Sequence, residues 1–227
     1  MRITWIGQSG YEISTNTTKI VIDPYLSDVV NRIANRPRLV EAPFSPEMLT
    51  ADAVICSHDH LDHFDIDAVA DMNRGLAFIT TNDCKEKLSE LGFSKISVIT
   101  VGDTITVGDI KITAVYANHT VDAFGIIICA DNRTLYFSGD TVYDEKLFEI
   151  AKYSPDVTFI CINGKLGNMN VTEAVHTAKK IGAKINVPNH YGMFASNTED
   201  PNLFTEKINN GFIMEFNREY ELEEILK

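Results

Sequence analysis

The sequence predicts an α/β fold in which two β-sheets pack face to face and carry helices on their outer faces, an αββα sandwich. Many short apolar runs of strand type alternate with helical patterns along the 227 residues of the chain. Hydrophobic residues make up 44% of the sequence, which is enough for a core shared by two sheets. No internal repeat or low-complexity linker divides the chain. We therefore expect a single domain over residues 1–227.

Strand predictions come from short runs rich in β-branched and aromatic residues that lie between turn signals. Residues 2–6, 11–14 and 19–23 predict an antiparallel meander with turns at 7–10 and 15–18. The pair Asn132-Arg133 marks the tip of a later hairpin. Further strands are expected at residues 53–56, 77–80, 96–100, 105–107, 110–116, 125–129, 133–137, 157–162, 184–187 and 212–216.

Helix predictions follow the helical spacing of apolar residues. The sequence Asn170-Val171-Thr172-Glu173 resembles a capping box, in which two side chains bond free N–H groups where a helix begins. Residues 24–50 contain several prolines and are the least regular part of the chain. Helices are expected at residues 66–72, 83–91, 144–152, 171–181 and 201–209.

Metal-capable side chains are densest directly after the apolar run at 53–56, in the sequence His58-Asp59-His60-Leu61-Asp62-His63. His58 and His60 can turn two neutral imidazoles toward one cation. Asp62 and His63 cannot join them on one tetrahedral ion without crowding, so a second ion nearby is expected. Asp59 is expected to be a solvated turn or helix-capping residue.

Three later apolar runs are also followed directly by a metal-capable side chain. Residues 112–118 lead into His119, residues 134–139 into Asp140, and residues 184–189 into His190. Enzymes of the α/β class build their sites at strand ends, where a rigid scaffold meets variable loops. A lone histidine is usually a surface or core residue. An ordered set of this size predicts metal binding instead.

The full set resembles the metallo-β-lactamase family, in which a His-x-His-x-Asp-His motif is followed by His, Asp and His. Asp23, in the run Val21-Ile22-Asp23-Pro24, matches the first motif of that family. The resemblance implies the metallo-β-lactamase fold with two mixed sheets, and hydrogen bonds from Asp23 that support the ligands. It also implies one ion held by His58, His60 and His119, a second held by Asp62, His63 and His190, and a bridge made by Asp140.

Residues 160–205 are similar to a narrower branch that contains L-ascorbate-6-phosphate lactonase. The similarity lies in Asn163-Gly164, Gly167-Asn168-Met169 and Asn189-His190-Tyr191-Gly192-Met193-Phe194. It implies manganese, the opening of a lactone of a small phosphorylated sugar, and substrate contacts from Asn163, Asn168 and Tyr191. An ordinary turn explains the glycines equally well, and aromatic packing explains the tyrosine.

The expected mechanism uses a hydroxide that bridges two divalent ions, with Asp62 and Asp140 as the catalytic carboxylates. The donor set suits Mn²⁺ or Zn²⁺, and iron also stays open. Di-iron relatives that reduce oxygen carry Glu at the position of His60, which favours hydrolysis over a redox role. The alternatives are a phosphodiesterase acting on a small phosphodiester or nucleotide, and a non-catalytic binding protein that retains the fold.

The formal net charge of −12 bears on the partners. A nucleic-acid-binding surface needs a basic stripe, and none is visible, so no nucleic-acid partner is expected. Two divalent ions, two carboxylates and one hydroxide leave a local charge of about +1, which favours a small anionic substrate. The oligomeric state, a homo-oligomer included, is left open.

Two features bear on location. No apolar run approaches the roughly 20 residues that span a bilayer, and the first residues lack the apolar segment of a signal peptide. We expect a cytoplasmic protein that does not enter the membrane. The four cysteines are far apart and are expected to be reduced thiols in the core: Cys56, Cys84, Cys129 and Cys161.

Three arginines lie in the irregular segment 24–50, which we expect to cover the site as a lid. They are Arg32, Arg36 and Arg38. We hypothesise that at least one of them binds an anionic group of the substrate. Solvated side chains on a connector are the alternative.

Overall fold

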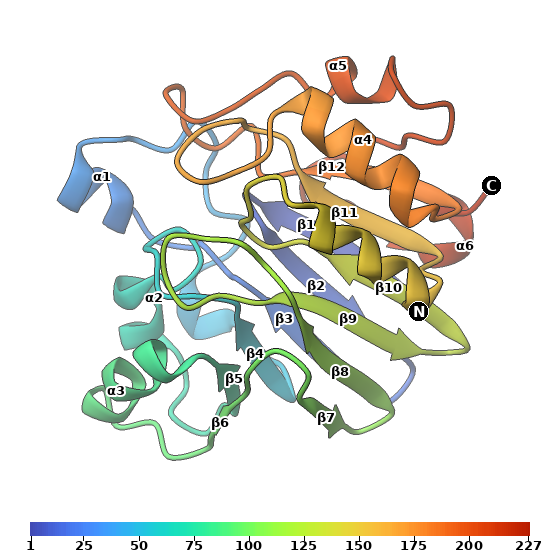
Figure 1. Ribbon diagram of the computed structural model, residues 1–227. Helices are drawn as coiled ribbons and strands as arrows, with labels where there is room; N and C mark the ends of the chain where they lie inside the picture. Colours follow the sequence, from blue (N-terminus) through green and yellow to red (C-terminus); the bar gives the residue numbers. More distant parts are fainter.

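The computed structural model describes residues 1–227 and contains two mixed β-sheets that pack face to face, which confirms the predicted fold class (Figure 1). The seven strands of one sheet are, in spatial order, β13 (Glu219–Glu221), β1 (Arg2–Gly7), β2 (Gly10–Ser14), β3 (Lys19–Ile22), β4 (Ala53–Cys56), β5 (Phe78–Thr80) and β6 (Ile96–Val98). The six strands of the other are β12 (Ile185–Asn189), β11 (Val157–Cys161), β10 (Arg133–Phe137), β9 (Gly125–Ala130), β8 (Ile110–Val115) and β7 (Thr104–Val107).

The seven-stranded sheet begins as the predicted antiparallel meander. β2 pairs antiparallel with both β1 and β3, and β3 to β6 then follow one another in parallel. β1 therefore runs in the same direction as β3 and β4. The ends of these strands lie at one edge of the sheet, where the loops that follow them can carry functional side chains.

In the six-stranded sheet, too, several strands run in one direction and end at the same edge. β9 pairs antiparallel with β8 and β10, and β10, β11 and β12 are parallel, so β8, β10, β11 and β12 run in one direction. The β9–β10 hairpin turns at Asp131 and Asn132, one residue earlier than predicted. Their φ angles of 52° and 57° are the left-handed pair that a two-residue type I′ turn requires.

Aromatic residues from both sheets meet in the core. The ring of Tyr11 in β2 lies 5.0 Å from that of Phe137 in β10 and 4.9 Å from that of Phe159 in β11, and the two phenylalanine rings stack at 4.2 Å. Full burial of a large apolar side chain contributes about 1.5–3 kcal/mol. This contact holds the two sheets, and hence their strand ends, in a fixed relation.

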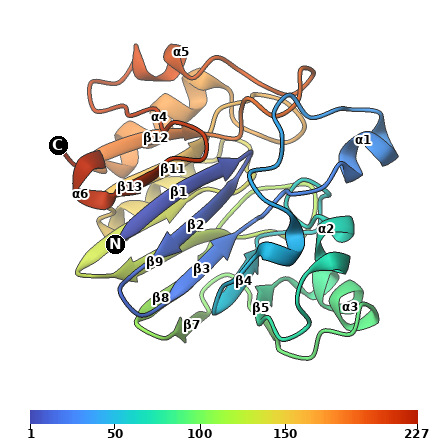
Figure 2. The same ribbon diagram turned by 180° about the vertical axis from the view of Figure 1, so that it is seen from behind.

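Helices cover parts of the outer faces. α4 (Val171–Ile181) and the 3₁₀ helix η2 (Glu145–Tyr153) lie over the six-stranded sheet in Figure 1. α2 (Ile66–Asp71) and α3 (Asn82–Glu90) lie beside β4 and β5, whereas Figure 2 shows β1, β2 and β3 without a helix in front of them. The shorter helices are α1 (Val29–Ala34), η1 (Pro46–Met48), α5 (Asn202–Thr205) and α6 (Leu222–Ile225).

Most predicted elements are present within one or two residues of their bounds, but three predictions need correction. The predicted strand at 212–216 is wrong: Phe212 only bonds through its N–H to the carbonyl of Asn186, and β13 takes the place beside β1. The helix expected at 201–209 is reduced to α5, and the one at 144–152 is the 3₁₀ helix η2. The irregular segment 24–50 contains α1. None of the helices has the length and apolar character needed to cross a membrane.

Candidate metal centre

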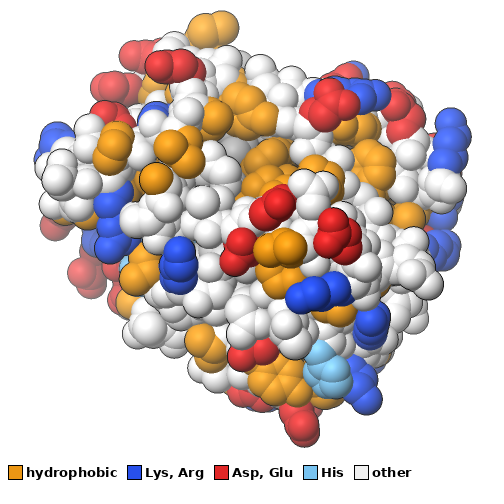
Figure 3. Space-filling model, turned by 90° about the horizontal axis from the view of Figure 1, so that it is seen from above, with side chains coloured by type: hydrophobic (Ala, Val, Ile, Leu, Met, Phe, Trp, Pro, Cys, Tyr) orange, Lys and Arg blue, Asp and Glu red, His pale blue; other side chains and the backbone are white.

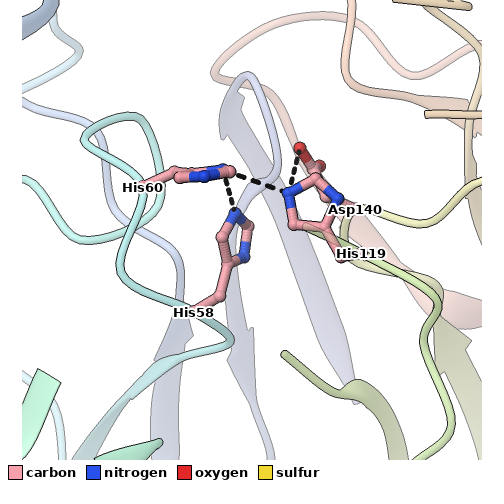
Figure 4. A group of neighbouring side chains, drawn as sticks. All are labelled: His58, His60, His119 and Asp140. Atoms are coloured by element: carbon pink, nitrogen blue, oxygen red, sulfur yellow. Dashed lines mark hydrogen bonds and ion pairs between the residues drawn. The ribbon is translucent and has the colours of Figure 1, made fainter. Parts of the chain in front are cut away.

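Two groups of metal-capable side chains lie where the strands end. Within each group the candidate ligand atoms lie within 4.8 Å of one another. The first group, drawn in Figure 4, contains His58, His60, His119 and Asp140, and the second contains Asp62, His63 and His190. The structure thus brings together all of the ligands that the sequence singled out. Asp59 joins neither group and forms an ion pair with Lys87 at 2.8 Å.

Three ring nitrogens converge in the first group. Nδ1 of His60 lies 3.2 Å from Nε2 of His58 and 3.0 Å from Nε2 of His119. Nδ1 of His119 lies 3.1 Å from the carbonyl oxygen of Gly167, which can only accept, so this nitrogen carries the hydrogen. Nε2 of His119 is then a lone pair aimed at the other rings, as in a metal ligand.

Asp23, which directly follows β3, supports one histidine of each group. Its Oδ2 lies 2.7 Å from Nδ1 of His63 and accepts the hydroxyl of Ser57 at 2.6 Å. Because Ser57 donates to Asp23, its oxygen accepts from Nδ1 of His58 at 3.1 Å. In their neutral forms both histidines therefore present Nε2 as a lone pair. Asp23 is buried, and its φ of 41° lies in the left-handed region that non-glycine residues rarely adopt.

Asp140 lies between the two groups. Its Oδ1 is 3.1 Å from Nε2 of His63 and 3.2 Å from Nε2 of His190. Its Oδ2 is 3.9 Å from Nε2 of His119. Each oxygen thus faces a different group, which is the placement that the predicted bridging role requires.

Gln8 is a residue of this centre that sequence analysis missed. It is fully buried in the turn between β1 and β2, with a φ of 52°. Its Nε2 donates to Oδ2 of Asp62 at 2.7 Å and lies 3.1 Å from Nε2 of His190, while its Oε1 has no hydrogen-bond partner. In the sequence, the flanking Gly7 and Gly10 indicate only that Gln8 lies in a turn. The shared direction of β1 and β3 is what brings this turn to the ligands.

The donor set and its unsatisfied atoms fit divalent cations. Buried polar atoms normally have hydrogen-bond partners. Nε2 of His63 and Oδ1 of Asp140 lie 3.1 Å apart without hydrogen-bond geometry, and neither atom has a hydrogen-bond partner elsewhere. Imidazole and carboxylate donors without a thiolate suit zinc, manganese and iron. A pair of ions, one in each group, therefore stays our prediction.

The two groups differ in their proton affinity. Burial acts to lower the pKa of His190, but Asp140 and Asp62 together outweigh it and the pKa rises to about 9. Burial likewise opposes protonation of His63, but the surrounding carboxylates, led by Asp140, raise its pKa well above the ordinary value. In the first group burial dominates and lowers the pKa of His58 and His119. Protons therefore balance the carboxylates of the second group until a cation replaces them.

A cavity of about 510 Å³ opens onto the centre, within the range of roughly 300–1,000 Å³ for small-molecule sites. Its lining includes the candidate ligands His60, Asp62 and Asp140. The remaining lining residues are Val30, Ala34, Arg36, Leu61, Thr120, Leu166, Gly167, Phe194 and Asn197. Figure 3 views the molecule from above and shows hydrophobic side chains beside a hollow near the middle of this face.

The residues predicted to contact substrate lie outside this lining. Asn163 is buried, and its Nδ2 donates at 2.7 Å to Oδ1 of Asn197, which does line the cavity. Both amide atoms of buried Asn168 lack a hydrogen-bond partner. Tyr191 lies in the core with its ring 4.8 Å from that of Trp5. The structure therefore gives Tyr191 a packing role.

The three arginines of the segment 24–50 have different surroundings. Arg32 donates two hydrogen bonds to Asp67, at 2.8 and 2.7 Å. Arg38 donates to backbone carbonyls of its own segment at 2.7 and 2.8 Å. Only Arg36 lines the cavity. Because α1 also contributes lining residues, the segment does cover part of the site.

A protein-family model described as the Beta-lactamase superfamily domain matches residues 18–191 of the chain. Among similar proteins, a UPF0173 metal-dependent hydrolase from Methanopyrus kandleri is 26% identical over 222 residues, which cover 92% of this chain and 91% of the relative. A UPF0173 metal-dependent hydrolase from Oenococcus oeni is 28% identical over 240 residues, which cover 97% of this chain and 100% of the relative.

Solved structures share the fold. Igni18, a metallo hydrolase from Ignicoccus hospitalis, has a TM-score of 0.80 at 22% identity, covering 97% of this chain and 98% of the other. An isothiocyanate hydrolase from Delia radicum gut bacteria has a TM-score of 0.81 at 20% identity, covering 97% of this chain and 99% of the other. With the strand order and the family match taken together, the chain has the metallo-β-lactamase fold and belongs to the beta-lactamase superfamily.

Proposed function

We propose that this protein is a metal-dependent hydrolase that opens an ester or lactone bond in a small anionic substrate. The observation that carries the proposal is the position of both ligand groups beside one cavity, with His60, Asp62 and Asp140 in its lining. The similar proteins from M. kandleri and O. oeni are named metal-dependent hydrolases, which supports the same reaction class here.

Divalent cations at the two groups would supply a water of lowered pKa and polarise the oxygen of the group under attack. The cavity lining contains no serine or cysteine, so the proposed reaction uses water as the nucleophile. His58, His60 and His119 would hold one ion, Asp62, His63 and His190 the other, and Asp140 would contact both.

Asp62 is the carboxylate best placed to move a proton. Its side chain is 18% exposed at the cavity, whereas that of Asp140 is 6% exposed. The hydrogen bond from Gln8 holds Oδ2 of Asp62 in one direction. We assign Asp62 the delivery of a proton to the leaving oxygen, and Asp140 the holding of the ions. Leu166 and Phe194 in the wall would keep bulk water from the reacting group.

The resemblance to L-ascorbate-6-phosphate lactonase makes a phosphorylated sugar lactone the first substrate to test. The hydroxyl groups of a sugar need polar partners. Beside the candidate ligands and Arg36, the lining offers the side chains of Thr120 and Asn197 for this purpose, among mostly apolar walls. These walls support a lactone or ester with a less polar body better than they support a sugar.

The test loads the protein with Mn²⁺ or Zn²⁺ and compares hydrolysis of L-ascorbate 6-phosphate, an alkyl lactone and a generic phosphodiester. We expect both lactones to be opened faster than the phosphodiester is cleaved. Asp140→Ala should lose metal and activity together. His176→Ala is the matched control, because His176 is exposed on α4 and packs near Tyr143 and Phe148, and it should keep both.

Two results would contradict the proposal. Cleavage of the phosphodiester without lactone opening would make the protein a phosphodiesterase. Full metal loading with no turnover of any substrate would favour a binding protein that retains the fold.

A further inference from the structure

We propose that Arg36 anchors an anionic group of the substrate, so that the site selects small esters or lactones carrying a carboxylate or phosphate beyond an apolar body. This inference rests on the proposed function, because it names the substrate class of the same site. Arg36 is the one lysine or arginine among the residues that line the cavity. It therefore supplies the fixed positive charge of the wall, separate from the candidate ligands.

The guanidinium of Arg36 is available to a ligand, whereas those of its neighbours are not. Arg32 is engaged by both oxygens of Asp67, and Arg38 is engaged by backbone carbonyls. Arg36 is half-buried and makes neither an ion pair nor a side-chain hydrogen bond with the protein. A half-buried arginine without an acceptor favours binding of an external anion.

The backbone on both sides of Arg36 is held in place. α1 ends at Ala34, and the capping residue Asn35, which has a φ of 51° and donates its N–H to the carbonyl of Asn31, turns the chain just before Arg36. Two residues later Arg38 bonds to backbone carbonyls of the segment, and its guanidinium lies 4.9 Å from the centre of the Tyr25 ring. A fixed segment lowers the entropy lost when Arg36 binds a ligand.

The walls around Arg36 define the rest of the substrate. Val30 and Ala34 come from α1, and the other apolar lining residues are Leu61, Leu166 and Phe194. Apolar walls reduce the screening of the arginine charge, which strengthens its attraction for an anion. The planar guanidinium also matches the paired oxygens of a carboxylate or phosphate. The expected substrate thus has an anionic end, an apolar body and a hydrolysable bond at the metal centre.

The test uses two aryl esters of equal chain length, 4-nitrophenyl pentanoate and mono-4-nitrophenyl glutarate, which differ by a terminal carboxylate. The metal-loaded protein should prefer the glutarate ester. In Arg36→Ala the ratio of kcat/KM for the charged over the neutral ester should fall about tenfold or more, the loss of one charge-assisted contact. Arg36→Lys should retain part of the preference. Arg32→Ala removes a neighbouring surface charge and should leave the ratio unchanged.

Binding is measured in parallel with the corresponding amides, glutaramate and pentanamide, by calorimetry on the same variants. A preference for glutaramate that disappears in Arg36→Ala, with no ester hydrolysed, would keep this inference and remove the hydrolase proposal. Hydrolysis of both esters with an unchanged ratio of kcat/KM in Arg36→Ala would keep the hydrolase proposal and remove the inference about Arg36. An equal fall of the ratio in Arg32→Ala would show that net surface charge, rather than Arg36, attracts the anion.

Discussion

Oδ2 of Asp23 lies 2.7 Å from Nδ1 of His63. The same oxygen accepts the hydrogen bond of Ser57, whose oxygen in turn contacts His58. One carboxylate outside the ligand set therefore orients a histidine in each group. Such outer partners set the direction and basicity of metal ligands.

Replacing Asp23 by alanine should weaken the binding of both ions by about 10–100-fold, since both histidines lose their orientation. Metal content after dialysis against chelators of graded strength measures the effect. Asp65→Ala is the matched control: Asp65 is equally buried and bonds backbone N–H groups at Leu26 and Ala68, but it touches no candidate ligand. It should lose stability and keep its metal. Equal metal affinity in wild type and Asp23→Ala would overturn the assignment.

Gln8→Leu should weaken the second ion selectively. Leucine is similar in size but cannot donate to Oδ2 of Asp62, so this ligand loses its 2.7 Å contact. We expect a loss of about tenfold or more in the affinity of the second ion, with the first retained. Metal titration followed by calorimetry resolves the two steps. A parallel loss of both ions would show that Gln8 supports the fold instead.

Gly167→Ala should disturb the first group. A Cβ at Gly167 would lie 2.9 Å from both Cε1 and Nδ1 of His119, at a φ of +90°. Gly92 offers a control with the same strain, because its φ is +87° and nothing lies within 4 Å of a Cβ built there. Both variants should lose about 1 kcal/mol of stability from backbone strain. Only Gly167→Ala should also lose affinity for the first ion.

The affinity of the second group should rise with pH. A cation must displace the protons of His190, whose pKa is about 9, and of His63, whose pKa is raised. Below about pH 9 each displaced proton should therefore give about a tenfold gain in affinity per pH unit. His58 and His119 have lowered pKa values and are already neutral at pH 7, so their ion should bind with little pH dependence. Calorimetry in buffers of different ionisation enthalpy counts the protons released.

Asn170→Ala should destabilise the protein by about 1 kcal/mol, the usual contribution of a helix N-cap. Oδ1 of Asn170 accepts a hydrogen bond from the N–H of Glu173 at 3.1 Å, and the carboxylate of Glu173 accepts one from the N–H of Asn170 at 2.9 Å. Thr172→Ala in the same turn is the control, because Thr172 is exposed and should be nearly neutral. Urea denaturation measures both. Equal midpoints for the two variants would contradict the predicted cap contribution.

Much of the candidate centre could be predicted from the sequence because its signals are local. Each predicted ligand follows an apolar strand, and the spacing of His58, His60, Asp62 and His63 is confined to one loop. The capping box at Asn170 and the hairpin near Asn132 are also local, and the structure contains both. These features depend on residues within a few positions of one another.

Other features depend on contacts between residues far apart in the chain. Gln8 is 54 residues from Asp62 and 182 from His190, so its role depends on β1 running in the same direction as β3. The apolar run at 212–216 has the composition of a strand, but the edge of the sheet beside β1 belongs to β13.

The sequence by itself determined the donor set, the order of the ligands at strand ends and the α/β character of the chain. Only the tertiary structure decided which arginine faces the cavity, that Gln8 reaches Asp62 and that Tyr191 packs in the core. The physical reason is that residue type and spacing set local conformation, whereas the partner of a side chain depends on how distant strands pair and pack.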